Sequence, residues 1–225
     1  MATIVWLLER TLIRVGSHEL ARENDSFGLT TLRRRHVSID GATLRFEFRG
    51  KSGVAHAVAV TDRRIARIVQ RCRELPGREL FQYVDARGKR QIVYADDVNT
   101  YLREITGRDV TAKDFRTWMG TMLAAAALRE MGLAPTKRAA ERNVLAAVDS
   151  TATRLGNTRA VCREYYIHPA LIDAYLEGAV LPSLPEPVWQ ERRTDGPTLR
   201  RHEAEVLAFL KERVGGRRTT ARERS

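Results

Sequence analysis

The sequence is poor in the residues that build disulfide frameworks and metal sites. Its two cysteines, Cys72 and Cys162, lie far apart and follow no ligand pattern. The five histidines show no ligand spacing such as H-x-x-x-H. A disulfide-stabilised scaffold is therefore excluded, and we expect no metal, no other cofactor and a reducing, cytoplasmic setting.

Long apolar runs are also missing. No stretch approaches the roughly 20 residues that span a bilayer, and Glu9 and Arg10 interrupt the apolar N-terminus too early for a signal peptide. The G-K-S at 50–52 resembles the end of a phosphate-binding P-loop, but position 45 is arginine where that loop needs glycine. We therefore expect neither a membrane nor a nucleotide as a partner.

Positive charge, in contrast, is in excess. The 39 Lys and Arg residues outnumber the 28 Asp and Glu residues, which gives a net charge of +11. Arginine dominates, and its planar guanidinium binds phosphate in a bidentate way. A basic balance of this size indicates nucleic acid as the partner, although charge alone also fits a merely soluble basic protein. The 225 residues, 43% of them hydrophobic, suffice for one large or two small packed domains.

The periodicity predicts a small sheet within a mainly helical chain. A helix is expected over 2–14, leading to Arg14. Alternation of apolar and polar residues predicts strands over 36–39, 43–48 and 55–60, joined by turns at 40–41 and 50–53. Lys51 is expected at the tip of the second hairpin. The fold class is thus α+β, mainly α, with a three-stranded antiparallel meander.

The remaining chain carries helix start and stop signals. Helices are expected over 62–75, 96–105, 111–132, 137–154, 199–214, and in two short segments after Thr158 and from Pro169 to Gly178. Three prolines mark 181–187 as a linker, and 215–225 reads as a disordered basic tail. We predict subdomains at 1–80, 81–181 (carrying Tyr166, the candidate nucleophile) and 182–225.

Tyr166 is the candidate nucleophile. A free phenol has a pKa of about 10, so only about one in a thousand is ionised at neutral pH. It needs cations that stabilise the developing negative charge. Arg116 and Lys113 are three residues apart on one expected helix face, opposite an apolar stripe, and Arg14 ends the first helix. Each also has an ordinary interpretation, as core tyrosine, solvated charge or helix-end cation.

Two further residues complete the candidate site. Lys51 lies in G-K-S-G, where a turn can carry an ammonium to a leaving oxygen as a general acid. Asn157, nine residues before Tyr166, can donate an amide hydrogen bond to a phosphate oxygen. The ordinary interpretations are an exposed turn lysine and a common helix-terminus asparagine.

These segments together resemble the catalytic domain of the type IB DNA topoisomerases, especially the bacterial and poxviral branch. The resemblance covers residues 7–175 and rests on R-V-G, A-R-E-N, F-R-G-K-S-G, T-A-K-D-F-R-T-W, L-G-N-T and Y-I-H-P. It implies that Arg14 and Arg116 clamp the phosphate, Lys51 is the general acid, Lys113 supports it, and Tyr166 forms a 3′-phosphotyrosyl link. It implies duplex DNA as substrate, a monomer, and no ATP or metal.

The sequence departs from this family at several places. Asn157 stands where poxviral and eukaryotic relatives have histidine, and Leu20 replaces an aromatic residue. Arg159 and Glu164 differ from the commoner proline and lysine, and the carboxylate of Glu164 is expected to lower activity. Relatives also carry an N-terminal β-rich clamp domain that this sequence does not include, so we expect weaker DNA binding with a smaller salt dependence.

Two alternatives stay open. A tyrosine recombinase uses related chemistry but usually has H-x-x-R around the second arginine, where this sequence has K-D-F-R. A non-catalytic DNA-binding relic would form no covalent adduct with DNA.

Overall fold

The computed structural model describes residues 1–179 and 196–222, and the chain divides into two compact units, Met1–Phe115 and Arg116–Ser225. The fold is α+β and mainly α, as predicted. The subdomain boundaries expected at 80 and 181 stay a prediction.

The first unit is built around a three-stranded antiparallel sheet. Its order is β1-β2-β3, with Phe46 of the central strand opposite both Val37 and Val58. The strands are β1 Val37–Asp40, β2 Thr43–Arg49 and β3 Ala55–Thr61. The predicted meander is confirmed. Along β2 buried and exposed residues alternate, so one face of the sheet is committed to the core.

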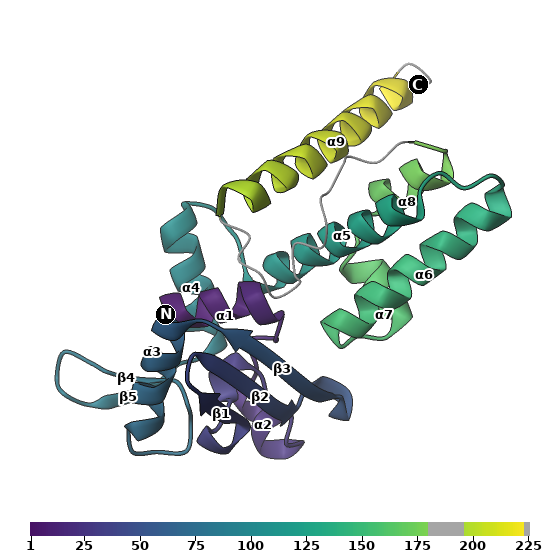
Figure 1. The fold of residues 1–225 in the computed structure, drawn as a ribbon. Helices are drawn as coiled ribbons and strands as arrows, with labels where there is room; N and C mark the ends of the chain where they lie inside the picture. Colours follow the sequence, from purple (N-terminus) through teal and green to yellow (C-terminus); the bar gives the residue numbers. More distant parts are fainter. Residues whose placement is uncertain (180–195, 223–225) are drawn as a thin grey trace. The chain divides into compact units, whose positions relative to one another are not determined.

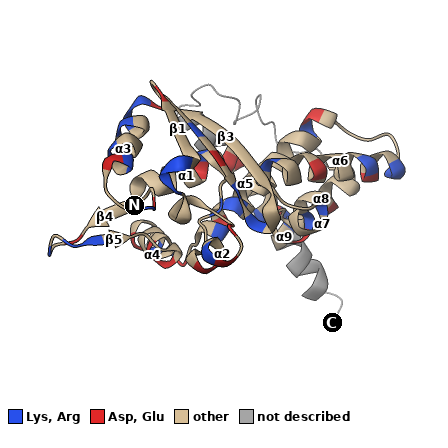
Figure 2. Ribbon diagram, turned by 90° about the horizontal axis from the view of Figure 1, so that it is seen from below, with Lys and Arg blue, Asp and Glu red and all other residues tan. Residues whose placement is uncertain are grey.

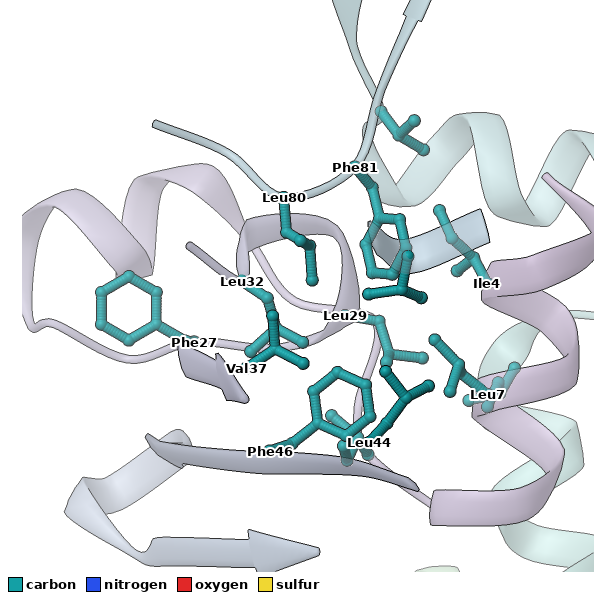
Figure 3. Packing of buried hydrophobic residues seen from close by; sticks show 14 of the residues in the cluster. Ile4, Leu7, Phe27, Leu29, Leu32, Val37, Leu44, Phe46, Leu80 and Phe81 are labelled. Atoms are coloured by element: carbon teal, nitrogen blue, oxygen red, sulfur yellow. The ribbon is translucent and has the colours of Figure 1, made fainter. Parts of the chain in front are cut away.

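That core joins the sheet to the first helix. Ile4 and Leu7 of α1 (Ala2–Thr11) lie near Leu29 and the β2 residues Leu44 and Phe46 (Figure 3). All five are at most 2% exposed. Burial of such side chains contributes about 1.5–3 kcal/mol each.

The other helices of the first unit lie around this core, and the β4–β5 hairpin projects away from it (Figure 1). They are α2 His18–Glu23, α3 Arg63–Glu74, β4 Gln82–Val84, β5 Arg90–Ile92, α4 Ala95–Thr106 and the first turn of α5 Ala112–Met131. The helices expected at 62–75, 96–105 and 111–132 are confirmed within one or two residues. The β4–β5 hairpin and α2 were not predicted.

The first helix is shorter than expected. It ends at Thr11 because Leu12 adopts a left-handed conformation (φ 57°) and donates its amide to the Leu8 carbonyl. Arg14 therefore lies in the loop beyond α1, and the expectation that it closes this helix is wrong.

The second unit is helical. After α5 come α6 Lys137–Leu155, α7 Arg159–Tyr165, α8 Pro169–Leu176 and α9 Gly196–Arg222. Helix α6 contacts both α7 and α8, and α8 contacts α9 (Figure 1). Local signals set the boundaries: the Thr158 side chain caps α7, and α6 stops at Gly156, which is left-handed (φ 60°).

The C-terminal helix differs from its prediction. It begins at Gly196 and continues to Arg222, so most of the segment expected to be a disordered tail is helical. The expected proline linker, 181–187, lies outside the described residues. Within the described part of the chain, none of the helices has the length and apolar character that crossing a bilayer requires.

Candidate active site

Arg116 is a buried cation held at the end of another helix. Its side chain is 3% exposed, and its Nη2 donates to the carbonyl oxygen of Leu155 at 2.8 Å. Leu155 is the last residue of α6, where carbonyls lack intrahelical partners and carry the negative end of the helix dipole. The ordinary interpretation of Arg116 as a solvated charge on α5 therefore does not hold, whereas Lys113 is exposed.

Tyr166 lies against that arginine. The guanidinium carbon of Arg116 is 5.3 Å from the centroid of the Tyr166 ring, which is within cation–π range. Tyr166 follows α7 directly, donates its backbone N–H to the Cys162 carbonyl at 3.0 Å, and is half-buried. The Tyr166 ring is thus beside a guanidinium, in a residue that is not fully buried.

Cys162, whose carbonyl accepts the Tyr166 amide, is fully buried. Burial raises the pKa of its thiol to about 11, and the nearby positive charge of Arg116 opposes this only in part. The thiol is therefore protonated at neutral pH and is not a competing nucleophile.

The neighbouring phenol has different surroundings. Tyr165 is 50% exposed, and a hydrogen bond with Glu164 raises the pKa of its phenol. Glu164, which we expected to lower activity, thus interacts with Tyr165. The phenols of Tyr165 and Tyr166 thus differ in their surroundings.

Asn157 is two residues beyond the carbonyl that Arg116 binds. It follows the left-handed Gly156, donates its backbone N–H to the Ala152 carbonyl at 2.9 Å, and is half-buried. Arg159, another departure from the family pattern, donates from Nε and Nη2 to the two carboxylate oxygens of Asp149, at 2.5 and 2.6 Å. This pair links α7 to α6 and gives Arg159 a structural role.

In the first unit, close backbone packing fixes the position of Arg14. Its carbonyl accepts the Leu29 amide at 2.8 Å, and the Val15 carbonyl accepts the Thr30 amide at 2.7 Å. A Cβ on Gly28 would lie 2.5 Å from the Arg14 oxygen, so only glycine permits this approach.

Lys51 is exposed on the turn between β2 and β3. The turn is a 3-10 segment, Lys51–Gly53, and it has positive φ at Ser52 (62°) and Gly53 (74°). Its base is tightly packed: a Cβ on Gly50 would be 2.6 Å from the His56 ring, which stacks on Phe48 at 5.0 Å. Lys51 is therefore an exposed side chain on a turn whose first residue, Gly50, is tightly packed.

The candidate residues are divided between the two units. Arg14, Lys51 and Lys113 belong to the first, and Arg116, Asn157 and Tyr166 to the second. The structure brings Arg116 and Tyr166 into contact and joins Arg116 to the helix end before Asn157. That all six candidate residues meet at one site stays a prediction.

The first unit carries basic groups that the sequence patterns did not single out. A cavity of about 600 Å³ is lined in part by Arg22, Arg33 and Arg78, with Glu19 and Glu79 also present. Lys and Arg also recur along α3 and at the tip of the β4–β5 hairpin (Figure 2). The run R-R-R at 33–35 was the available sequence signal.

Comparison of the sequence with known proteins matches the chain to one family. Residues 1–178 match the eukaryotic DNA topoisomerase I catalytic core. The chain is also similar to the DNA topoisomerase 1B of Acanthamoeba polyphaga mimivirus, with 31% identity over 170 residues, which are 72% of this chain and 51% of the relative. The chain thus spans about half the length of this curated relative. The relative is viral, so the expected closeness of this chain to bacterial proteins stays a prediction.

Proposed function

The chain belongs to the type IB DNA topoisomerases, as a catalytic core, and from this we propose that it relaxes supercoiled duplex DNA through a transient single-strand break. The Tyr166 oxygen attacks a backbone phosphorus, the P–O5′ bond breaks, and a 3′-phosphotyrosyl link forms. The phenol proton leaves to solvent, and the 5′ oxygen departs as a hydroxyl. After strand rotation, this hydroxyl attacks the phosphotyrosine and restores the chain.

One observation supports this proposal above the others: a buried guanidinium lies against the Tyr166 ring. In a site of low dielectric, a cation fixed in advance stabilises the charge that develops on the phosphorane without reorganisation. Arg116 is held by Leu155, so its position does not depend on DNA.

The remaining roles complete the chemistry. Arg14 is the second clamp on the non-bridging oxygens. Asn157 donates an amide hydrogen bond to one of these oxygens. Lys51 protonates the leaving 5′ oxygen, with Lys113 supporting it. Each step exchanges one phosphoester for another, so the bond energy is retained and the proposed reaction requires neither ATP nor a metal. We propose that the chain acts as a monomer on duplex DNA in the cytoplasm.

Two other functions are separable by experiment. A tyrosine recombinase would require paired specific sites and would not relax a plasmid of arbitrary sequence. A DNA-binding relic would bind without forming an adduct. The K-D-F-R segment, which ends at the buried Arg116, favours the topoisomerase.

The test uses a plasmid and a suicide substrate whose 5′-hydroxyl fragment dissociates. We expect the wild-type chain to relax the plasmid and to form a covalent adduct on the suicide substrate. Tyr166→Phe should form none. Tyr165→Phe is the matched control and should retain both activities. Adduct formation by Tyr166→Phe, or its loss in Tyr165→Phe alone, would overturn the assignment of the nucleophile.

A further inference from the structure

A glycine inside helix α5 touches the backbone of the proposed nucleophile. A Cβ added to Gly120 would lie 2.3 Å from the carbonyl oxygen of Tyr166 and 3.2 Å from its carbonyl carbon. Carbon atoms in ordinary contact are about 3.5–4.0 Å apart. Both colliding groups are main chain, so no side-chain rotation can relieve the overlap. The helix and the Tyr166 peptide therefore approach as closely as they do only because residue 120 is glycine.

Two threonines flank that glycine and bind the same segment. Thr117 Oγ1 donates to the Tyr165 carbonyl at 3.2 Å, and Thr121 Oγ1 accepts the His168 amide at 3.0 Å. Residues 117, 120 and 121 lie at i, i+3 and i+4, which places them on one face of the helix. This face, Thr117–Gly120–Thr121, holds the main chain on both sides of Tyr166.

The bond to Thr121 satisfies a main-chain group at a helix start. Thr121 is 2% exposed, and its hydroxyl also donates to the Thr117 carbonyl at 3.0 Å. His168 is the N-cap of α8, and the face thus fixes the point where the nucleophile segment enters α8. Arg116 precedes this face by one residue, so one helix carries both the guanidinium and the support for the phenol.

We propose that Thr117, Gly120 and Thr121 are positioning residues, which hold the Tyr166 main chain so that only side-chain rotation is needed to present the phenol to phosphate. The inference rests on the proposed role of Tyr166. It adds three residues whose contacts, as described above, are with the main chain on either side of the phenol. Displacement of a reacting group by about 1 Å is enough to reduce a rate about a hundredfold.

The tests use two kinds of variant with matched controls. Gly120→Ala inserts the colliding methyl, and Gly215→Ala adds the same methyl in α9, where nothing lies within 4 Å. Thr121→Val removes the acceptor, while Thr121→Ser retains it. Thr151→Val removes an equally buried hydroxyl, whose bond is to the Ala147 carbonyl within α6.

The first readout is the rate constant of adduct formation at saturating suicide substrate, compared with the dissociation constant for DNA. We expect about a hundredfold lower rate in Gly120→Ala and about tenfold lower in Thr121→Val, with the dissociation constant within twofold of wild type. Thr121→Ser and both controls should stay near wild type. A variant that had lost its structure would also bind DNA more weakly, so an unchanged dissociation constant shows that the fold is intact.

The second readout does not depend on activity. Amide hydrogen exchange of His168 should be at least about tenfold faster in Gly120→Ala and Thr121→Val than in wild type, and unchanged in Thr121→Ser and the controls. Unchanged exchange in both variants would overturn the proposal, whether or not the chain cleaves DNA. Inactive Tyr166→Phe together with fully active Gly120→Ala would also overturn it, and would leave the proposed function intact. Adduct formation by Tyr166→Phe would instead remove the proposed function.

Discussion

The guanidinium carbon of Arg116 lies 5.3 Å from the ring centroid of Tyr166, and the same side chain donates to the Leu155 carbonyl at 2.8 Å. One arginine therefore connects the proposed nucleophile with the end of α6. Its structural role and its proposed catalytic role make separable predictions.

Arg116→Lys should lower the rate of adduct formation about a hundredfold to a thousandfold, because an ammonium cannot hold Leu155 and phosphate in the same geometry. Single-turnover cleavage measures this effect. Thermal unfolding should show a smaller parallel loss of stability. Arg129→Lys makes the same change at an exposed position of α5 and should leave both quantities unchanged. Wild-type cleavage by Arg116→Lys would refute the clamp role.

Lys51→Ala should slow cleavage of an ordinary phosphodiester about a hundredfold, as expected for loss of a general acid. A substrate with sulfur in place of the bridging 5′ oxygen has a leaving group that needs no proton, so the variant should cleave it nearly as fast as wild type. Lys89→Ala, an exposed lysine of the β4–β5 hairpin, serves as the control. Equal slowing on both substrates would assign Lys51 to binding alone.

Gly28→Ala should destabilise the first unit by about 1–3 kcal/mol, the usual range for overpacking. The new methyl would meet the Arg14 carbonyl at 2.5 Å and the Gly16 amide nitrogen at 2.6 Å, both main-chain atoms. Urea unfolding gives the free energy. Because Arg14 would be displaced, cleavage should fall even where the variant is fully folded. A folded Gly28→Ala with wild-type cleavage would contradict a role for Arg14.

His36 should make stability depend on pH. Burial, then Arg35 and Arg33, lowers its pKa to about 4, and Asp25 opposes this shift. Its Nδ1 accepts the Arg33 amide at 3.1 Å, a bond that protonation would break. The folded-state pKa is below the unfolded value of about 6.5, so the contribution is complete above pH 6.5 and is lost as pH falls toward 4.

The free energy of unfolding of the wild type should therefore decline over that window, at no more than about 1.4 kcal/mol per pH unit from this group. His36→Asn keeps an acceptor and does not titrate, so its decline should be shallower. Parallel curves for the two proteins would show that His36 is not the cause.

Local signals explain why much of the fold was predictable. Asp62 accepts from the Ile65 amide at 2.8 Å, the Asp114 carboxylate binds the Thr111 amide at 2.8 Å, and Gly156 ends α6. Each signal acts within a few residues, so the sequence displays it directly. The β4–β5 hairpin was missed because its strands have three residues each and none of these residues is fully buried, which leaves no hydrophobic alternation to detect.

The site was less accessible to prediction, because it depends on contacts distant in sequence. The burial of Arg116 follows from Leu155, 39 residues later, and helical periodicity carries no trace of that bond. Gly120 is similar. A glycine inside a helix costs about 1 kcal/mol relative to alanine, so it signals a close approach without naming the segment that approaches.

The last helix lies wholly beyond the residues that match the family. Trp118, two positions after Arg116, donates its indole N–H to Glu203 of α9 at 2.8 Å, and Arg213 binds Glu177 at 3.1 Å. Val206 and Leu210 of the same helix are at most 6% exposed. A chain cut at residue 178 would leave the apolar partners of these two side chains facing water. Engineers who shorten this protein to its matching segment should expect poorer solubility and a less stable catalytic unit.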